Sequence, residues 1–222
     1  MSPRTVLITG ASRGIGRAIA LKFSHEGYHL LTPSHAELDL SSNISIDRYV
    51  KNLQTKVDIL INNAGINRLA AGEECTDEDL DDTLQINLVA PARLARAVIP
   101  WMVQQKFGRI INISSIWGVV SKPRRFAYTI SKTGINGLTR ALAVELGPHN
   151  ILVNSVVPGY VNTELTQKNN SLQDIQKISD QIPLGRLAEP AEIANLVSFL
   201  CSDKNSYITG QMIVIDGGFT CQ

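Results

Sequence analysis

The chain has 222 residues, of which 44% are hydrophobic and 18% are charged, with a formal net charge of +1. This length fits one α/β domain with a sizeable core, and the balanced charge excludes a strongly basic surface of the kind that binds nucleic acid. No apolar stretch reaches the roughly 20 residues that cross a bilayer, and no secretory leader pattern is visible. We therefore expect a cytoplasmic protein with no membrane or nucleic-acid partner.

The cysteines and histidines show no spacing typical of a metal site or of a disulfide framework. His25 and His29 are four residues apart, but Gly27 between them is expected to end a helix, so the two rings should not share a face. We expect no bound metal. In a reducing compartment we expect three free thiols, at Cys75, Cys201 and Cys221.

Short apolar runs rich in β-branched residues alternate with longer helical patterns along the chain. The expected strands are residues 5–9, 29–32, 57–61, 109–114, 152–157 and 212–215, and the expected helices are residues 14–26, 46–54, 77–104, 126–147 and 190–201. Nearly continuous apolar strands are typical of strands buried on both faces. The alternation predicts parallel βαβ units with right-handed crossovers, and hence one doubly wound Rossmann-type domain over residues 1–222.

The connection after the second expected strand is too short for a regular βαβ unit. After the second expected strand, the sequence "LLTPSHAELDLSSN" leads almost at once into the next helical pattern. A crossover between parallel strands needs a dozen or more residues, usually with a helix. We therefore expect that the helix after the second strand is missing and that the following strand is absent or vestigial, which leaves six main strands in a mainly parallel sheet.

Three glycines, Gly10, Gly14 and Gly16, lie between the first expected strand and the first helix, in "LITGASRGIGRAIA". Glycine permits the tight turn and lets the backbone approach a pyrophosphate closely. The start of the following helix offers unpaired N–H groups and a partial positive charge. In this strand–turn–helix context the glycines predict a dinucleotide-binding loop, although an ordinary glycine-rich turn would carry the same residues.

The stretch "FAYTISK" at residues 126–132 places Tyr128 and Lys132 one helical turn apart on the same face. Reduction of a carbonyl group by hydride requires an acid for the oxygen and a fixed geometry. An ammonium group near the phenol favours the phenolate, so we expect Lys132 to lower the pKa of Tyr128. The same ammonium can bind the ribose next to a nicotinamide. Two unrelated surface residues are the alternative interpretation.

Several further motifs follow in order: "NNAG" at 62–65, "IN" at 86–87, "NISS" at 112–115, "YTISK" at 128–132 and "PGYVNT" at 158–163. Together with the glycine loop, these motifs resemble the short-chain dehydrogenase/reductase family over nearly the whole chain. Within that family the 3-oxoacyl-(acyl carrier protein) reductase branch is the most similar, through "FGRIINISS" and "VNSVVPGYVNTEL". The resemblance implies an NAD(P)-dependent oxidoreductase.

The resemblance also implies four catalytic residues: Asn87, Ser115, Tyr128 and Lys132. Ser115 lies thirteen residues before Tyr128 and is expected to bind the substrate oxygen. Its neighbour Ser114 is expected to point to the opposite face, with a structural role. Asn87 is expected to hold a water that passes protons to Lys132, or alternatively to be a buried amide bonded to the backbone.

The candidate cofactor contacts follow the strand ends. Residues 63–65 are expected at the adenosine ribose, Asp39 at the adenine amine, and residues 158–163 at the nicotinamide carboxamide. The full set is Gly10, Ser12, Arg13, Gly14, Ile15, Gly16, Ser34, Asp39, Leu40, Asn63, Ala64, Gly65, Tyr128, Lys132, Pro158, Gly159, Val161 and Thr163.

No acidic residue stands at the end of the second expected strand, where the sequence is "LTPSH" at 31–35. An acid there would bind the ribose 2′-hydroxyl of NAD and repel a 2′-phosphate. Arg13 can pair with that phosphate, and Ser34 can add a hydroxyl. We therefore expect NADP(H) to be favoured over NAD(H), unless Glu37 or Asp39 is brought into the position of the missing acid.

The substrate is expected to be a small ketone or alcohol, possible forms being thioester-linked or nucleotide-linked. The polar segment 163–187 predicts one or two short helices that close as a lid. The basic run Lys122, Arg124 and Arg125 is either an attractant for an anionic substrate or a solvated turn. Arg109 resembles one of two basic positions that dock a carrier protein, while His149 replaces the other.

Three other functions stay open beside a 3-oxoacyl-thioester reductase. They are a sugar-nucleotide reductase, another secondary-alcohol dehydrogenase of the family, and a catalytically silent dinucleotide-binding sensor. The helices expected at 77–104 and 126–147 are rich in alanine, leucine and isoleucine. The resemblance implies that they pair across the interface of a homodimer, often within a homotetramer.

Overall fold

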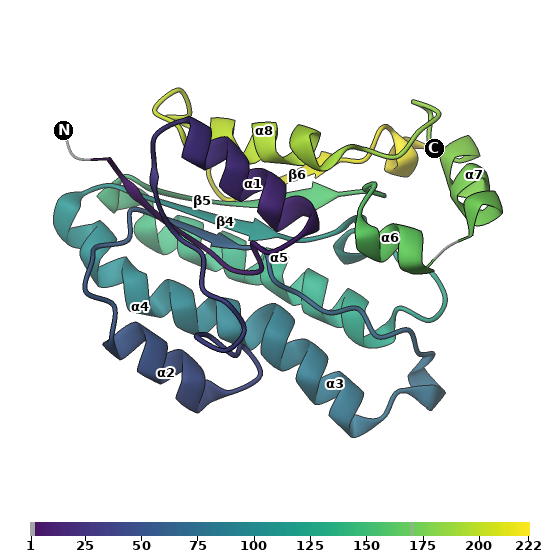
Figure 1. The fold of residues 1–222 in the computed structure, drawn as a ribbon, viewed down its shortest axis with the longest axis horizontal. Coiled ribbons are helices and arrows are strands. Elements are labelled where there is room, and N and C mark those ends of the chain that lie inside the picture. Colours follow the sequence, from purple (N-terminus) through teal and green to yellow (C-terminus); the bar gives the residue numbers. More distant parts are fainter. Residues whose placement is uncertain (1–2, 170) are drawn as a thin grey trace.

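Six parallel strands form the centre of the molecule, in the order β2-β1-β3-β4-β5-β6 (Figure 1). The computed structural model describes residues 3–169 and 171–222; residues 1–2, and residue 170 inside the expected lid, lie outside the described part. The strands are β1 (Thr5–Ile8), β2 (His29–Leu31), β3 (Ile59–Asn62), β4 (Gly108–Ile113), β5 (Ile151–Pro158) and β6 (Met212–Ile215). Because β2 and β3 lie on opposite sides of β1, the strand order reverses there, which is where doubly wound sheets bind their ligands.

Helices cover both faces of the sheet. In Figure 1, α1 and α8 lie on one face, α2, α4 and α5 on the other, and α6 and α7 beyond the carboxyl ends of the strands. The helices are α1 (Gly14–His25), α2 (Asn43–Lys51), α3 (Asp77–Leu84), α4 (Ala90–Gln105), α5 (Phe126–Leu146), α6 (Glu164–Asn169), α7 (Leu172–Asp180) and α8 (Pro190–Cys201). Single 3-10 turns are η1 (Gly72–Glu74), η3 (Ile116–Gly118), η4 (Gly147–His149) and η5 (Phe219–Cys221).

Two cores form because successive strand side chains point to opposite faces. Leu7 of β1 packs on the α4 and α5 side, whereas Val6 and Ile8 pack on the α1 and α8 side. All three side chains are fully buried. The nearly continuous apolar pattern of the strands therefore has the expected cause, and the single doubly wound domain is confirmed.

The shortened connection after β2 is also confirmed. Residues 32–42 form only turns and irregular backbone, without a helix or strand, and α2 begins at Asn43. Leu38 and Leu40 are buried in the α4-side core. Two apolar anchors thus replace the missing helix, and they hold this loop against the sheet beside the carboxyl end of β1.

The helix expected at 77–104 is interrupted. Between α3 and α4 lies a π-helical segment, η2 (Gln85–Val89), where the N–H of Ala90 donates to the carbonyl of Gln85 five residues back. Pro91 in the first turn of α4 has no N–H, so it cannot donate to the carbonyl of Asn87. We attribute the π segment to this missing donor, and such segments often occur at functional sites.

The helical run Asp77–Gln105 is, by length and composition, apolar enough to cross a membrane. In this fold it is a core helix, because Leu94, Val98 and Met102 of its second half are fully buried against the sheet. Core helices of this kind commonly have the same composition as membrane spans.

Candidate active site

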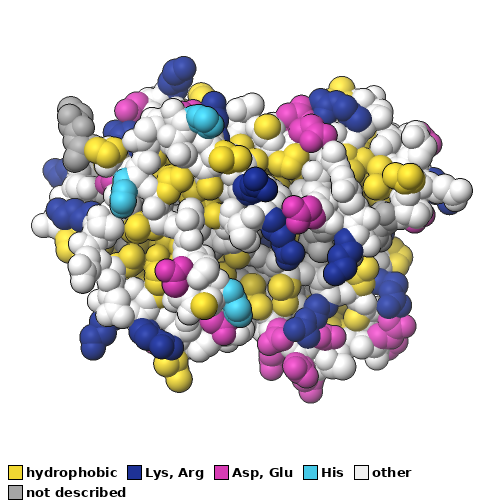
Figure 2. Space-filling view, viewed as in Figure 1, with side chains coloured by type: hydrophobic (Ala, Val, Ile, Leu, Met, Phe, Trp, Pro, Cys, Tyr) yellow, Lys and Arg dark blue, Asp and Glu magenta, His cyan; other side chains and the backbone are white. Residues whose placement is uncertain are grey.

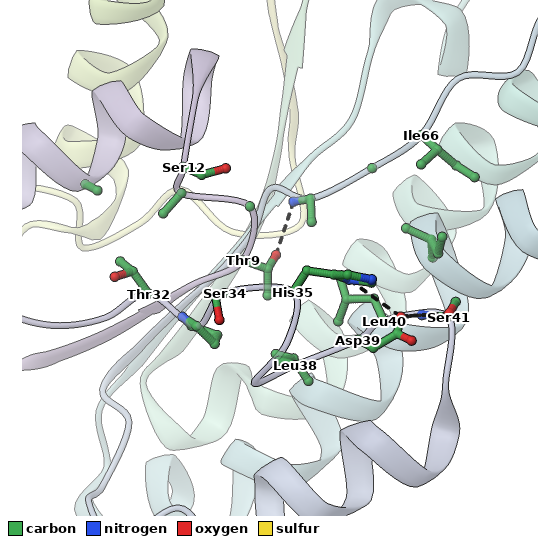
Figure 3. A pocket seen from close by; sticks show the side chains of 17 residues that line it. Thr9, Ser12, Thr32, Ser34, His35, Leu38, Asp39, Leu40, Ser41 and Ile66 are labelled. Carbon is green, nitrogen blue, oxygen red and sulfur yellow. Dashed lines mark hydrogen bonds and ion pairs between the residues drawn. The ribbon is translucent and has the colours of Figure 1, made fainter.

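Two cavities open at the carboxyl ends of the strands, on either side of the segment Gly65–Ile66. The larger has a volume of about 520 Å³ and is lined by the glycine loop and residues 32–41 (Figure 3). The smaller has a volume of about 290 Å³ and contains Ser115, Tyr128 and Lys132. Because both are lined by Gly65 and Ile66, the pair forms one bent groove, which suits an extended two-part ligand.

The glycine loop is packed against the segment after β3. A Cβ atom on Gly16 would lie 2.1 Å from the carbonyl oxygen of Gly10, so only glycine fits there. The Asn63 amide donates to the carbonyls of Thr9 and Gly10, both at 3.0 Å. The Thr9 hydroxyl accepts from the N–H groups of Asn63 and Ala64, both at 3.1 Å. These bonds fix the shape of the cradle that a pyrophosphate needs.

The serine, tyrosine and lysine converge in the smaller cavity. Ser115 and Tyr128 line this cavity together, and the Ser115 Oγ accepts from the N–H of Trp117 at 3.2 Å. The Lys132 Nζ donates to the carbonyl of Ile113, the last residue of β4, at 2.8 Å. It lies 5.6 Å from the centre of the Tyr128 ring. These contacts join β4, η3 and α5 around one point.

Burial shifts the ionisation of both groups. It raises the pKa of Tyr128, while the Ser115 hydroxyl and the Arg125 guanidinium act in the opposite direction. Burial also lowers the pKa of Lys132 to about 8. The expectation that Lys132 gives Tyr128 a lowered pKa is therefore wrong for this structure: burial raises the pKa of Tyr128, and the opposing positive charge comes from Arg125.

Asn87 lies in the π segment beside this cavity. Its Oδ1 accepts from the N–H of Ile66, and its Nδ2 donates to the Ile66 carbonyl, both at 2.9 Å. Nδ2 also lies 3.1 Å from the hydroxyl of Ser131. The side chain is thus the buried, backbone-bonded amide of the alternative interpretation. A Cβ on Gly65 would come within 3.1 Å of this amide, so glycine lets the loop pass close to it.

A chain of buried polar side chains, which the sequence did not reveal, lies below the site. Asn62 donates to Asn112, which donates to the hydroxyl of Thr139, both at 2.9 Å, and Thr139 lies 2.7 Å from the hydroxyl of Ser155. The chain links β3, β4, α5 and β5. Ser114 adds a bond of 3.2 Å to the Lys132 carbonyl, which agrees with its expected structural role. Together these bonds hold α5 at a fixed position on the sheet.

Local contacts hold the loop 32–41, which forms one side of the larger cavity (Figure 3). The N–H and hydroxyl of Ser34 both donate to the Glu37 carboxylate at 2.8 Å. Asp39 accepts from the N–H and hydroxyl of Ser41, and these bonds lower the pKa of Asp39. His35 Nδ1 lies 3.8 Å from the same carboxylate. The Ser34 hydroxyl is therefore already engaged with an acid.

Most predicted contact residues line one cavity or the other. The larger cavity is lined by Gly10, Ser12, Ser34, Asp39, Leu40, Ala64 and Gly65. The smaller is lined by Ile15, Asn63, Gly65, Ser115, Tyr128, Lys132, Pro158, Gly159, Val161 and Thr163. Four predicted residues line neither of them: Arg13, Gly14, Gly16 and Asn87. Arg13 is the exposed N-cap of α1.

Several lining residues were not among the predicted contacts, namely Thr9, His35, Leu38, Ile66, Trp117, Arg125 and Tyr160. Thr9 and Tyr160 lie inside motifs that the sequence did single out. Arg125 lies inside the basic run, where its neighbours Lys122 and Arg124 are of the same type. Residue type alone could not tell which of the three faces the cavity.

Arg109 does not match its expected docking role. Only 3% of the residue is exposed, and its guanidinium donates to the carbonyls of Gly108, Asn150 and Asn205. Its cation also lies 4.5 Å from the centre of the Phe107 ring. Arg109 is therefore a structural residue and cannot present a charge to a carrier protein. The three cysteines are free thiols, as expected.

Comparisons with known proteins agree with this geometry. The family described as enoyl-(acyl carrier protein) reductase matches residues 31–220. A 3-oxoacyl-[acyl-carrier-protein] reductase FabG from Thermotoga maritima is 36% identical, with 97% of each chain covered. A structure assigned as an NAD(P)-dependent gluconate 5-dehydrogenase from Beutenbergia cavernae, with bound NADP, superposes with a TM-score of 0.94 at 32% identity, covering 100% of this chain and 98% of its own.

A second solved structure, a 4-hydroxyisoleucine dehydrogenase mutant with NADH and succinate, also gives a TM-score of 0.94 at 32% identity and covers 99% of each chain. Both structural neighbours have the fold described above over their whole length. The chain belongs to the short-chain dehydrogenase/reductase family and is an NAD(P)-dependent oxidoreductase acting on alcohol or ketone groups.

Proposed function

We propose that the chain reduces a ketone to a secondary alcohol, with Tyr128 as the general acid. The observation that carries this proposal is that Ser115, Tyr128 and Lys132 line one cavity, which adjoins the cavity at the glycine loop. The glycine loop suits the pyrophosphate of a dinucleotide. At Gly16 even a Cβ atom would clash with the Gly10 carbonyl, so the loop keeps the tight, side-chain-free turn that such a ligand needs. When bound, the dinucleotide supplies the hydride.

Each side chain has a distinct part in this proposal. The Ser115 hydroxyl binds the substrate oxygen as negative charge develops on it. Tyr128 donates its proton to that oxygen, and the Lys132 ammonium stabilises the phenolate that is left behind. Asn87 holds the segment at Ile66 through two hydrogen bonds. We also propose that Asn87 holds a water that passes protons to Lys132. The π segment favours this role, because the Asn87 carbonyl lacks the N–H donor that residue 91 would supply in a regular helix.

For the cofactor we propose NADP(H) over NAD(H). No acid lines the cavity at residues 32–35, and the exposed Arg13 stands at the start of α1, beside that cavity. Glu37 weakens the preference, because its carboxylate reaches Ser34, where a 2′-phosphate would lie. The preference therefore depends on the balance between Arg13 and two acids, Glu37 and Asp39, of which Asp39 lines the cavity.

For the substrate, a 3-oxoacyl thioester is the first candidate, because relatives named 3-oxoacyl-[acyl-carrier-protein] reductase are 36% to 40% identical to this chain. A sugar-nucleotide ketone or another secondary alcohol is the second candidate. The solved neighbours are named for gluconate and 4-hydroxyisoleucine, so the fold itself accepts different substrates. A silent sensor is disfavoured by the complete set of four catalytic residues.

We further propose a cytoplasmic homodimer or homotetramer. Exposed apolar side chains on α4 and α5 would pair in such an assembly, including Trp101 and Val144, with 44% and 80% of each residue exposed. The edge strand β6 also exposes Met212 and Val214. The helices α6 and α7 occupy the predicted lid segment, and we propose that they close over the smaller cavity when substrate binds.

The test is turnover of a ketone panel with NADPH, including acetoacetyl-CoA, keto-sugars and simple ketones, by the wild type and by Tyr128→Phe. The phenylalanine variant keeps the ring but has no proton to donate. We expect kcat to fall about 10³-fold and the dissociation constant for NADPH to change by less than about threefold. A variant that retains the wild-type rate would show that Tyr128 is not the acid.

A further inference from the structure

The basic run 122–125 divides into an outer and an inner part. On the outside, the Arg124 guanidinium lies 2.7 Å from the Glu74 carboxylate and 3.3 Å from the Leu69 carbonyl. Glu74 belongs to the acidic surface over η1 and the start of α3 (Figure 2). Arg124 is thus neutralised by a partner on the surface.

On the inside, Arg125 lines the same cavity as Ser115 and Tyr128. It is the N-cap residue of α5, three positions before Tyr128. Its cation lies 5.8 Å from the centre of the Trp117 ring, which forms one wall of the cavity. The aromatic ring and the helix start thus hold Arg125 on the substrate side of the catalytic tyrosine.

No described residue neutralises Arg125. Its Nε and Nη1 atoms are buried without a hydrogen-bond partner, and no ion pair to an acid is found in the described residues. Burial lowers the pKa of this guanidinium, and only the Tyr160 and Tyr128 oxygens oppose that shift. A half-buried, uncompensated guanidinium is unfavourable, so its presence in a cavity calls for a ligand that neutralises it.

The whole smaller cavity has the same imbalance. Among the residues that the structure describes, its lining has two cations, Arg125 and Lys132, and no aspartate or glutamate. Lys132 is already bonded to the Ile113 carbonyl and is assigned to the cofactor and to Tyr128 in the proposed mechanism. The charge of Arg125 is therefore left for the substrate.

From this geometry we propose that Arg125 binds a carboxylate of the substrate, and that the substrate is a small oxo acid whose ketone reaches Ser115 and Tyr128. The inference rests on the proposed ketone reduction and selects among its substrates. A volume of about 290 Å³, shared with the nicotinamide ring, fits a molecule of a few carbon atoms. Guanidinium and carboxylate match in shape and charge.

The reaction balances as one oxo acid, one NADPH and one proton giving one hydroxy acid and one NADP⁺. The new C–H bond at the ketone carbon would take the hydride whose C–H bond in NADPH breaks; the proton from Tyr128 forms the O–H bond, and a solvent proton restores the phenol. The carboxylate takes no part in the electron transfer. Arg125 is a substrate-binding residue, so its removal should act on acids and spare their esters.

The experiment compares acetoacetate and levulinate with their methyl esters, in the wild type and in Arg125→Met, Arg125→Lys and Arg124→Met. In the wild type we expect kcat/KM to be higher for each acid than for its ester. Arg125→Met should lower kcat/KM for the acids ten- to a hundredfold, the size expected for a lost hydrogen bond to a charged group, and change the esters by less than about threefold. Arg125→Lys should restore part of the loss, and Arg124→Met should keep the wild-type ratio.

Equal loss on acids and esters in Arg125→Met, or no advantage of acids in the wild type, would overturn the inference while leaving ketone reduction intact. Failure of every ketone to turn over would instead contradict the proposed function. In that case the melting temperature of the NADP⁺-loaded protein tests whether Arg125 binds a carboxylate. Acetoacetate should raise it in the wild type and in Arg124→Met but not in Arg125→Met, and the absence of this difference rejects the carboxylate site.

Discussion

The two ends of the groove are built in different ways. In the smaller cavity, the polar contacts join residues far apart in the sequence, such as Lys132 with Ile113 and Asn87 with Ile66, and they are buried. In the loop 32–41 of the larger cavity, by contrast, Ser34 contacts Glu37 and Asp39 contacts Ser41 through exposed hydrogen bonds between near neighbours in the sequence. Changes in the first region must disturb several elements, whereas changes in the second stay local. The reaction geometry is thus fixed by the fold, and the cofactor preference is adjustable.

After Tyr128→Phe, variants of the adjacent residues Ser114 and Ser115 give the sharpest test of the smaller cavity, which is the fixed end of the groove. Ser115→Ala removes the hydroxyl that shares the cavity with Tyr128 and is proposed to bind the substrate oxygen. We expect kcat to fall about 10²- to 10³-fold, the size seen when one oxyanion donor is lost, and the free energy of unfolding to fall by about 1 kcal/mol, because the bond from the Trp117 N–H is lost as well. Ser114→Ala is the matched control. It removes only the bond to the Lys132 carbonyl and should mainly lower the free energy of unfolding, by about 1 kcal/mol.

Equal kinetic losses in the two serine variants would mean that the segment 114–115 acts only through its structure. Steady-state kcat and chemical denaturation of both variants provide the measurement.

Lys132→Met tests how much the buried ammonium group of Lys132 lowers the free energy of unfolding. The pKa of Lys132 is lowered to about 8 in the folded protein and is near 10.4 in an unfolded chain. Between these values the unfolded chain holds more protons, so the Lys132 contribution to the free energy of unfolding increases with pH. Below pH 8 we expect Lys132→Met to be more stable than the wild type by about 3 kcal/mol, and the difference should vanish near pH 10.5.

Denaturation curves at pH 7, 8.5 and 10 measure this difference directly. The comparison with the variant removes the contributions of other groups, such as Cys201, whose thiol pKa is raised by burial. A stability difference that stays constant with pH would contradict the lowered pKa of Lys132. The same variant should lose most of its turnover, because the ammonium that stabilises the phenolate is gone.

Much of the fold was predictable because it depends on residue spacing and backbone geometry that can be read from a single sequence. Six apolar runs predicted six strands, and the missing helix followed from the minimum length of a parallel crossover. The glycine loop was recognisable because only glycine fits where Gly16 approaches Gly10. These features depend on backbone space and on residue periodicity, which a single sequence carries.

The parts that were not predictable depend on contacts chosen in three dimensions. The π segment had a weak signal, since Pro91 follows Asn87 by four residues, but a proline also begins many regular helices. Arg109 looked exposed by resemblance, yet Asn205, far along the chain, buries it. Arg124 and Arg125 are identical in type, and the left-handed backbone at Arg124, with φ of 65°, prevents any alternation rule from showing which one faces the cavity.

The adjustable end leads to the smallest expected effects. Glu37→Gln keeps an acceptor for Ser34 but removes the negative charge next to the proposed 2′-phosphate position. Because Glu37 is exposed and screened by solvent, we expect KM for NADPH to fall only about two- to fivefold, with KM for NADH unchanged within twofold. Arg13→Ala should act in the opposite direction and raise KM for NADPH about tenfold.

Glu145→Gln on the exposed side of α5 is the matched control, because it removes the same charge away from the groove. Initial rates with both cofactors for the three variants measure the effect, and the ratio of the two KM values cancels any general loss of activity. If Glu37→Gln and Arg13→Ala both leave that ratio at the wild-type value, neither the loop 32–41 nor Arg13 of the glycine loop senses the 2′-phosphate. The choice of cofactor would then have to come from the smaller cavity, which would contradict the assignment of cofactor preference to the larger one.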